Sequence, residues 1–283
     1  MDWIRLMYKN PSELKSASEV LYHAAQYISM AGRFFIPTKE DDSHTNADWI
    51  ASKNWVLGNC INRPYGKIHV ALDYPLLVLI VCDDKLSPIA EIDLNGKNRL
   101  EVFNWLNNQL WKLGIEVDEF EPELHYQLID HPLMHGSNFE MKRPKDFLEL
   151  ANYRSNGHAL LQQVTANYED KSDVRIWPHH FDDGVIVNLE RDHESVVSLL
   201  SMGLAMPDKY YDQPYFYVNA WKNSGVDYTK LPPIKGRGQW HEDEWHGQVL
   251  LAEDIAKEND HEDQKQISLA FFEEAMKNAI SLL

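Results

Sequence analysis

The chemistry of this sequence is densest in the stretch D-V-R-I-W-P-H-H-F-D, residues 173–182. Residues 174–177 favour a short β-strand, and Pro178 predicts that this strand ends at Trp177, because proline cannot donate a hydrogen bond to a neighbouring strand. Two adjacent imidazoles and a carboxylate follow at once. We therefore take the end of this strand as the first place to look for groups that handle protons or metal ions.

The geometry of residues 177–182 allows three interpretations. Regular β alternation would put His179 and His180 on opposite faces, whereas a turn would let His180 and Asp182 share one face. One hypothesis is a small-molecule pocket with the two histidines as polar contacts and with walls formed by Trp177, Phe181, Tyr215 and Tyr217. The alternative is a metal-dependent or His–Asp hydrolytic enzyme, with His180 and Asp182 as acid–base groups or metal ligands. The third is structural: the polar groups hydrogen-bond the turn, and the two aromatic rings join the core.

A second histidine cluster, W-H-E-D-E-W-H-G, occupies residues 240–247. His241 and His246 are five residues apart, so they do not share a helical face and the cluster is not the zinc motif H-E-x-x-H. On a loop they could join His180 and Asp182 to complete a site for a divalent metal, the cofactor that this hypothesis implies. A solvated acidic loop anchored by its tryptophans explains the same residues.

The longest aromatic run lies at residues 210–221. If this run is a strand, Tyr215 and Tyr217 share one face and Phe216 and Val218 the other. The two tyrosines could line a pocket for a sugar or another ring-bearing ligand, and ordinary sheet packing accounts for them as well.

Working outward, hydrophobic periodicity predicts a fold of class α+β, with antiparallel sheets flanked by helices. We expect two similar α-βββ-α halves that pack as one unit: an N-terminal half (1–120), a connection (121–143) and a C-terminal half (144–283). Gly157 is expected to interrupt the helix that follows Pro144. Predicted helices cover about 12–30, 100–113, 144–168 and 262–282, and predicted strands cover 67–72, 76–81, 89–94, 174–177, 184–189, 215–220 and 248–251.

Composition narrows the classes of function. The 283 residues carry a net charge of −17 with no basic tract, which argues against a nucleic-acid partner because phosphates would be repelled. No apolar run approaches the ~20 residues that span a bilayer, and the first residues lack a signal-peptide pattern, so we expect a cytoplasmic protein with no membrane partner. Cys60 and Cys82 are too few for a disulfide framework. Glycine-rich nucleotide motifs and the G-x-S-x-G elbow are absent.

Several short motifs occur in a fixed order: G-K (66–67), L-G-I-E-V (113–117), E-P-E (121–123), W-P-H-H-F-D (177–182), P-Y-F-Y-V (214–218) and a late strand that ends at Leu251 before the last helix. Together they resemble a bacterial family of similar length that is catalogued only as a domain of unknown function. The resemblance extends from about residue 54 to the C terminus. It implies that the central motif matters and assigns no activity.

Overall fold

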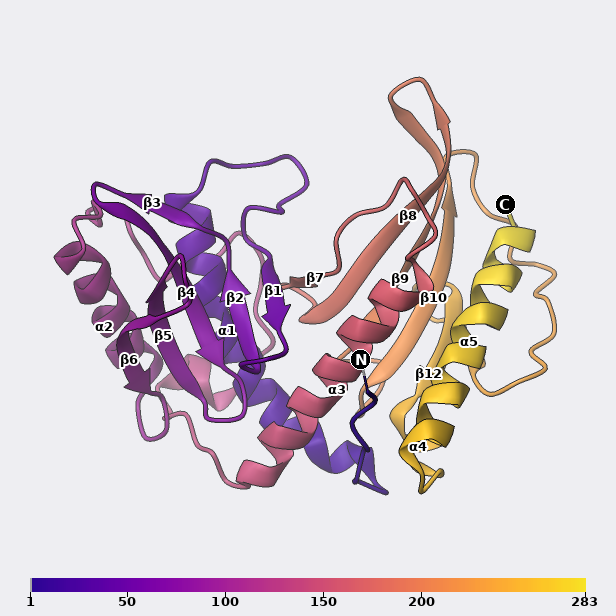
Figure 1. Cartoon of the computed structure of the whole chain (residues 1–283), viewed down its shortest axis with the longest axis horizontal. Helices are drawn as coiled ribbons and strands as arrows, with labels where there is room; N and C mark the ends of the chain where they lie inside the picture. The colour runs from indigo at the N-terminus through magenta and orange to yellow at the C-terminus, as the bar shows by residue number, and fades with distance from the viewer. Residues whose placement is uncertain (1) are drawn as a thin grey trace. The chain divides into compact units, whose positions relative to one another are not determined.

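A computed structural model describes residues 2–283 (Figure 1), and the contacts between its residues divide the chain into two compact units. The C-terminal unit consists of Met1–Lys15, Asn152–Arg175 and Asp182–Leu283. The N-terminal unit consists of Ser16–Ala151 and Ile176–Phe181. Every strand pair in each unit is antiparallel, and helices flank the strands. The predicted α+β class is therefore confirmed.

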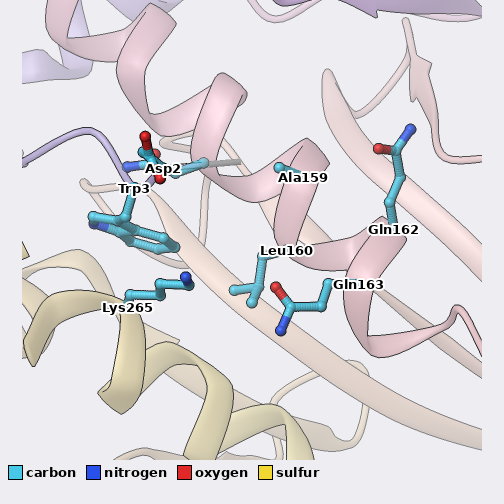
Figure 2. A pocket seen from close by; sticks show the side chains of 8 residues that line it. Asp2, Trp3, Ala159, Leu160, Gln162, Gln163 and Lys265 are labelled. Atoms are coloured by element: carbon cyan, nitrogen blue, oxygen red, sulfur yellow. The ribbon is translucent and has the colours of Figure 1, made fainter. Parts of the chain in front are cut away.

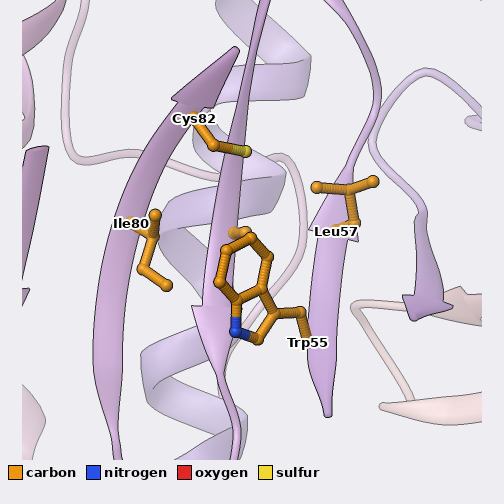
Figure 3. Packing of buried hydrophobic residues seen from close by; sticks show 5 residues of the cluster. Trp55, Leu57, Ile80 and Cys82 are labelled. Atoms are coloured by element: carbon orange, nitrogen blue, oxygen red, sulfur yellow. The ribbon is translucent and has the colours of Figure 1, made fainter. Parts of the chain in front are cut away.

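The N-terminal unit holds a sheet of strand order β7-β1-β2-β4-β5-β6, with β3 paired to β4. Residues Val70 and Val81 face each other in the β4–β5 ladder, whose interior is buried. Figure 3 shows part of one apolar cluster of this sheet, formed by Trp55, Leu57, Ala71, Ile80 and Cys82. The elements are α1 (Lys15–Phe35), β1 (Ala47–Ile50), β2 (Trp55–Gly58), β3 (Ile61–Arg63), β4 (Gly66–Asp73), β5 (Val78–Asp83), β6 (Pro88–Asp93), α2 (Arg99–Lys112), η2 (Pro132–His135) and β7 (Arg175–Trp177).

A local sequence signal fixes the start of α2. Asn98 accepts a hydrogen bond from the Glu101 amide at 3.0 Å, and the Glu101 carboxylate accepts one from the Asn98 amide at 2.8 Å, which closes a capping box at the start of α2. The long helix α1 is buried along most of its length.

Cys60 and Cys82 are free thiols, and burial raises the pKa of Cys82 to about 11.

The C-terminal unit holds a sheet of strand order β11-β12-β10-β9-β8. Its two longest strands, β8 and β9, form a hairpin in which Asp192 pairs with Ser195. The elements are η1 (Pro11–Leu14), α3 (Pro144–Val164, which enters this unit at Asn152), β8 (Asp182–Asp192), β9 (Ser195–Ala205), β10 (Tyr215–Lys222), β11 (Gln239–His241), β12 (Gly247–Leu251), α4 (Ala252–Ala256) and α5 (His261–Ser281).

Helices α3 and α5 pack on the same face of this sheet. A Cβ atom added to Gly157 of α3 would meet Leu204 of β9 at 2.5 Å, and Phe272 of α5 packs on Phe216 of β10 with ring centroids 5.3 Å apart. Leu204 and Phe216 are directly paired across the β9–β10 ladder, so their side chains project from one face. The two helices therefore lie over that face together.

One sequence prediction is wrong, and one long strand was not predicted. Gly157 does not interrupt α3; it lies inside the helix, where the absence of a side chain lets the helix backbone approach Leu204. Strand β9 was not predicted, because its serines and Gly203 obscure the alternation of apolar residues, although it pairs with both of its neighbours along most of its length.

Within residues 2–283, no helix has the length and apolar character needed to cross a bilayer.

Candidate functional site

The motif at residues 177–181 forms a tight turn in the N-terminal unit. The Phe181 amide donates to the Trp177 carbonyl at 2.6 Å, and Phe181 has φ +58, a left-handed conformation that is costly for a bulky residue. Its ring is 2% exposed and packs near Tyr22 and Tyr74, with centroids 5.9 and 6.1 Å away. Phe181 was predicted to line a ligand pocket; the structure places it among buried rings, where burial offsets the backbone strain.

A buried amide attaches this turn to α1. Gln26, which is fully buried, donates through Nε2 to the Pro178 carbonyl at 3.1 Å and to the Tyr22 carbonyl at 2.9 Å. Its Oε1 accepts a hydrogen bond from the Tyr126 hydroxyl at 2.6 Å, and that hydroxyl also lies 3.0 Å from the Ser29 hydroxyl. One glutamine thus holds the turn, α1 and the loop around Tyr126 together, which limits how far the turn can move.

Both histidines of the motif are exposed on this held turn. The His179 ring lies 4.3 Å from that of His180, 5.9 Å from Tyr126 and 6.2 Å from Trp177, centroid to centroid. Desolvation by its surroundings, together with the neighbouring His180 imidazole, lowers the pKa of His179 to about 4. At neutral pH His179 is therefore uncharged and can both donate and accept a hydrogen bond.

An imidazole–carboxylate pair stands beside these residues. His125 Nε2 lies 2.9 Å from Asp42 Oδ2, both side chains are partly exposed, and the His125 ring packs edge-on against Tyr126 at 5.0 Å. We define the histidine face as Asp42, His125, Tyr126, Trp177, His179 and His180. All six residues belong to the N-terminal unit.

A cavity of about 360 Å³ adjoins this face through a shared residue, because Tyr126 contributes to both. Arg99 supplies a positive charge to the cavity wall, and its guanidinium also contacts the Met134 sulfur. The lining is Arg99, Pro122, Leu124, Tyr126, Gln127, Leu128 and Met134.

The two carboxylates that follow the turn belong to the C-terminal unit and point to opposite faces of its sheet. Asp182 accepts a hydrogen bond from the Tyr217 hydroxyl at 2.5 Å. Asp183 accepts one from Arg154 of α3 at 2.6 Å, with both side chains fully buried. Asp183 pairs with Leu204 across the β8–β9 ladder, so it faces the helices, whereas Asp182 faces the tyrosines of β10.

Tyr215 and Tyr217 share a face of β10 as predicted, and they belong to a packed aromatic cluster. Tyr215 donates to Asp208 at 2.7 Å and packs on Tyr211 at 4.8 Å, while Tyr217 packs on Trp245 at 6.2 Å. Burial raises the pKa of both Tyr215 and Tyr217 above the ordinary tyrosine value. These hydroxyls act as donors to carboxylates of the same unit.

The histidines proposed as metal ligands in the C-terminal unit have other contacts. His241 has one ring nitrogen 2.9 Å from the Tyr211 hydroxyl and the other 2.7 Å from the Asp243 carbonyl. His246 stacks on Tyr228 at 4.5 Å. Across the described part of the chain, no group of three or more His, Cys, Asp or Glu side chains is arranged to hold a metal ion.

Sequence reasoning did not find Gln26, Asp42, His125 or Tyr126 as members or supports of this site. They come from α1 and from two loops far from residues 177–181 in the sequence, and no spacing pattern connects them. The only available signal was the position of His125 and Tyr126 in the connection between the halves.

The comparisons with known proteins add no identity: no family model matches the chain, and neither the curated proteins nor the solved structures contain a significant match. The resemblance drawn from the short motifs therefore stays a prediction. The residues themselves define the candidate site: two exposed histidines on a turn that Gln26 holds in place, with the partly buried rings of Trp177 and Tyr126 and the His125–Asp42 pair beside them.

Proposed function

We propose that this protein binds a small molecule at the histidine face, as the sequence hypothesis for the W-P-H-H-F-D motif anticipated. The observation that carries the proposal is the display of His179 and His180, two exposed imidazoles, on a turn fixed from beneath by Gln26. A binding site benefits from such a buried support, because less entropy is lost when the ligand binds.

The chemistry of the face favours a ring-bearing, hydroxylated ligand. The imidazole of His179 is neutral at pH 7 and offers both a donor and an acceptor. Trp177 and Tyr126 offer aromatic surface near it. Arg99, in the adjoining cavity, would accommodate an acidic substituent such as a phosphate.

A screen of wild-type protein with monosaccharides and nucleosides, each free and as a monophosphate, tests this proposal by thermal shift followed by calorimetry. We expect at least one compound to bind, and His179→Ala to weaken that binding by roughly tenfold or more. The matched control is His135→Ala, because His135 is likewise an exposed histidine and lies on η2, outside the face. Absence of any binding, or equal losses in the two variants, would reject the proposal.

One observation favours hydrolysis as a second candidate function. The His125–Asp42 pair, 2.9 Å apart, has the arrangement in which a carboxylate orients an imidazole for general-base catalysis. The earlier candidate pair was His180 with Asp182, and Asp182 accepts from Tyr217 in the C-terminal unit. Hydrolysis of p-nitrophenyl esters or phosphates that disappears in Asp42→Asn, with His135→Ala unaffected, would favour this second function.

A further inference from the structure

Helices α3 and α5 of the C-terminal unit lie over the same face of the sheet, and residues of both helices line two cavities. The first has a volume of about 390 Å³ and the second about 590 Å³, and Gln163 lines both. The first is lined by Asp2, Trp3, Asn156, Ala159, Leu160, Gln162, Gln163 and Lys265 (Figure 2). Most of these side chains carry hydrogen-bonding groups, which distinguishes this cavity from a packing defect in an apolar core.

Side-chain amides on the two helices hold one wall of this cavity in place. Asn156 of α3 exchanges two hydrogen bonds with the backbone of Ile4, at 2.8 and 2.7 Å. Gln264 of α5 does the same with the backbone of Leu6, at 2.9 and 3.0 Å, and also accepts from the Trp3 indole at 3.3 Å. The indole is thus fixed between the helices, 8% exposed, with its remaining surface toward the cavity.

Two opposite charges flank this fixed ring. In Figure 2, Asp2 and Lys265 lie on opposite sides of Trp3, and Leu160 and Gln163 stand across the space from the ring. Within residues 2–283, the side chains of Asp2, Gln163 and Lys265 form no hydrogen bond or ion pair. Their polar groups are therefore available to a ligand.

We propose that this cavity binds a free α-amino acid with an apolar side chain. The ammonium group would pair with Asp2, and the carboxylate would pair with Lys265 and accept a hydrogen bond from the Gln163 amide. The apolar side chain would lie between the face of the Trp3 ring and the side chain of Leu160. A zwitterion suits this site because each of its charges meets one opposite charge, and the complex adds no net charge to the cavity.

Calorimetry with four probes tests both charge contacts: L-leucine, L-phenylalanine, N-acetyl-L-leucine and L-leucinamide. N-acetylation removes the ammonium group and amidation removes the carboxylate, so each derivative should bind roughly tenfold or more weakly than leucine. Lys265→Met should weaken leucine binding by a similar factor and leave leucinamide binding unchanged. Asp2→Asn should weaken leucine binding and leave N-acetyl-leucine binding unchanged.

Two controls separate this site from its surroundings and from the histidine face. Lys277→Met changes a lysine that lines only the second cavity and should not affect leucine binding. His179 belongs to the N-terminal unit, so His179→Ala should leave leucine binding intact. Failure of the amino-acid site would therefore not decide whether the histidine face binds a ligand, and the reverse also holds. Equal affinity for leucine and leucinamide, an unaffected Lys265→Met variant, or no binding of leucine or phenylalanine would overturn the amino-acid site.

Discussion

The turn at residues 177–181 and the two carboxylates that follow it are adjacent in sequence, yet they use their polar groups in opposite ways. His179 and His180 are exposed on a turn that is supported from beneath. Asp182 and Asp183 are buried, and one carboxylate oxygen of each is paired inside the unit, with Tyr217 and Arg154 respectively. Because polar groups that are already paired within a core have little capacity left for a ligand, the exposed half of the motif is the candidate site and the buried half stabilises the fold.

The largest expected effect concerns the buried half. Arg154→Met leaves the Asp183 carboxylate buried without its cation and should lower the free energy of unfolding by about 3–5 kcal/mol. Urea denaturation followed by circular dichroism measures the change. The double variant Arg154→Met/Asp183→Leu should recover much of the loss, since no charge is then buried alone.

The exposed ion pair Arg191–Asp170, with nitrogen and oxygen 2.5 Å apart, provides the matched control for that experiment. Arg191→Met should cost far less than Arg154→Met, because solvent screens a surface pair. Similar losses in the two variants would contradict the structural role assigned to Asp183.

The next effect is a dependence of stability on pH that arises from His23, a buried histidine of α1. Burial, and then the nearby His131, lower the pKa of His23 to about 3, so between pH 6.5 and pH 3 the unfolded chain binds a proton that the folded chain excludes. Stability should therefore fall as the pH falls through that window, by about 3 kcal/mol from this residue at pH 4.

His23→Leu tests this origin, because leucine removes the titrating group and keeps an apolar side chain in α1. Between pH 7 and pH 4, the free energy of unfolding of this variant should fall by less than that of the wild type. This comparison holds whatever the stability of the variant at pH 7. An unchanged slope, measured by urea denaturation at several pH values, would show that His23 does not titrate as described.

A smaller effect is expected at the buried support of the turn. Gln26→Ala removes the donor to Pro178 and the acceptor of the Tyr126 hydroxyl, and should cost about 1–3 kcal/mol. It should also weaken the binding of any ligand at the histidine face. Gln266→Ala, at an exposed glutamine of α5 whose side chain hydrogen-bonds to the exposed Glu262, serves as the control and should leave both properties near wild type.

The smallest effect on stability is expected at the exposed histidines. His179→Ala should change the free energy of unfolding by no more than about 0.5 kcal/mol, because its ring is exposed and supports no buried group. A loss comparable to that of Gln26→Ala would mean that His179 belongs to the structural support and not to the binding face.

Periodicity predicted the fold class and most of the long elements, because apolar faces repeat along α1, α2, β4, β5 and α5. It also placed Tyr215 and Tyr217 on one face of a strand. It could not show that Trp177–Phe181 belong to one unit and Asp182 to the other, since that assignment depends on contacts with residues far away in the sequence. Nor could it connect Asp42 or His125 with His179, because contacts between distant loops leave no local pattern.

The most direct test of the central claim is an imidazole nitrogen NMR spectrum of the 13 histidines, recorded during titration with the sugar or nucleoside that binds best. The account predicts that the resonances of His125, His179 and His180 shift together and saturate at the measured affinity, while those of His135 and His193, both exposed elsewhere, stay fixed. Shifts confined to His241 and His246, or shared equally by the exposed control histidines, would contradict it.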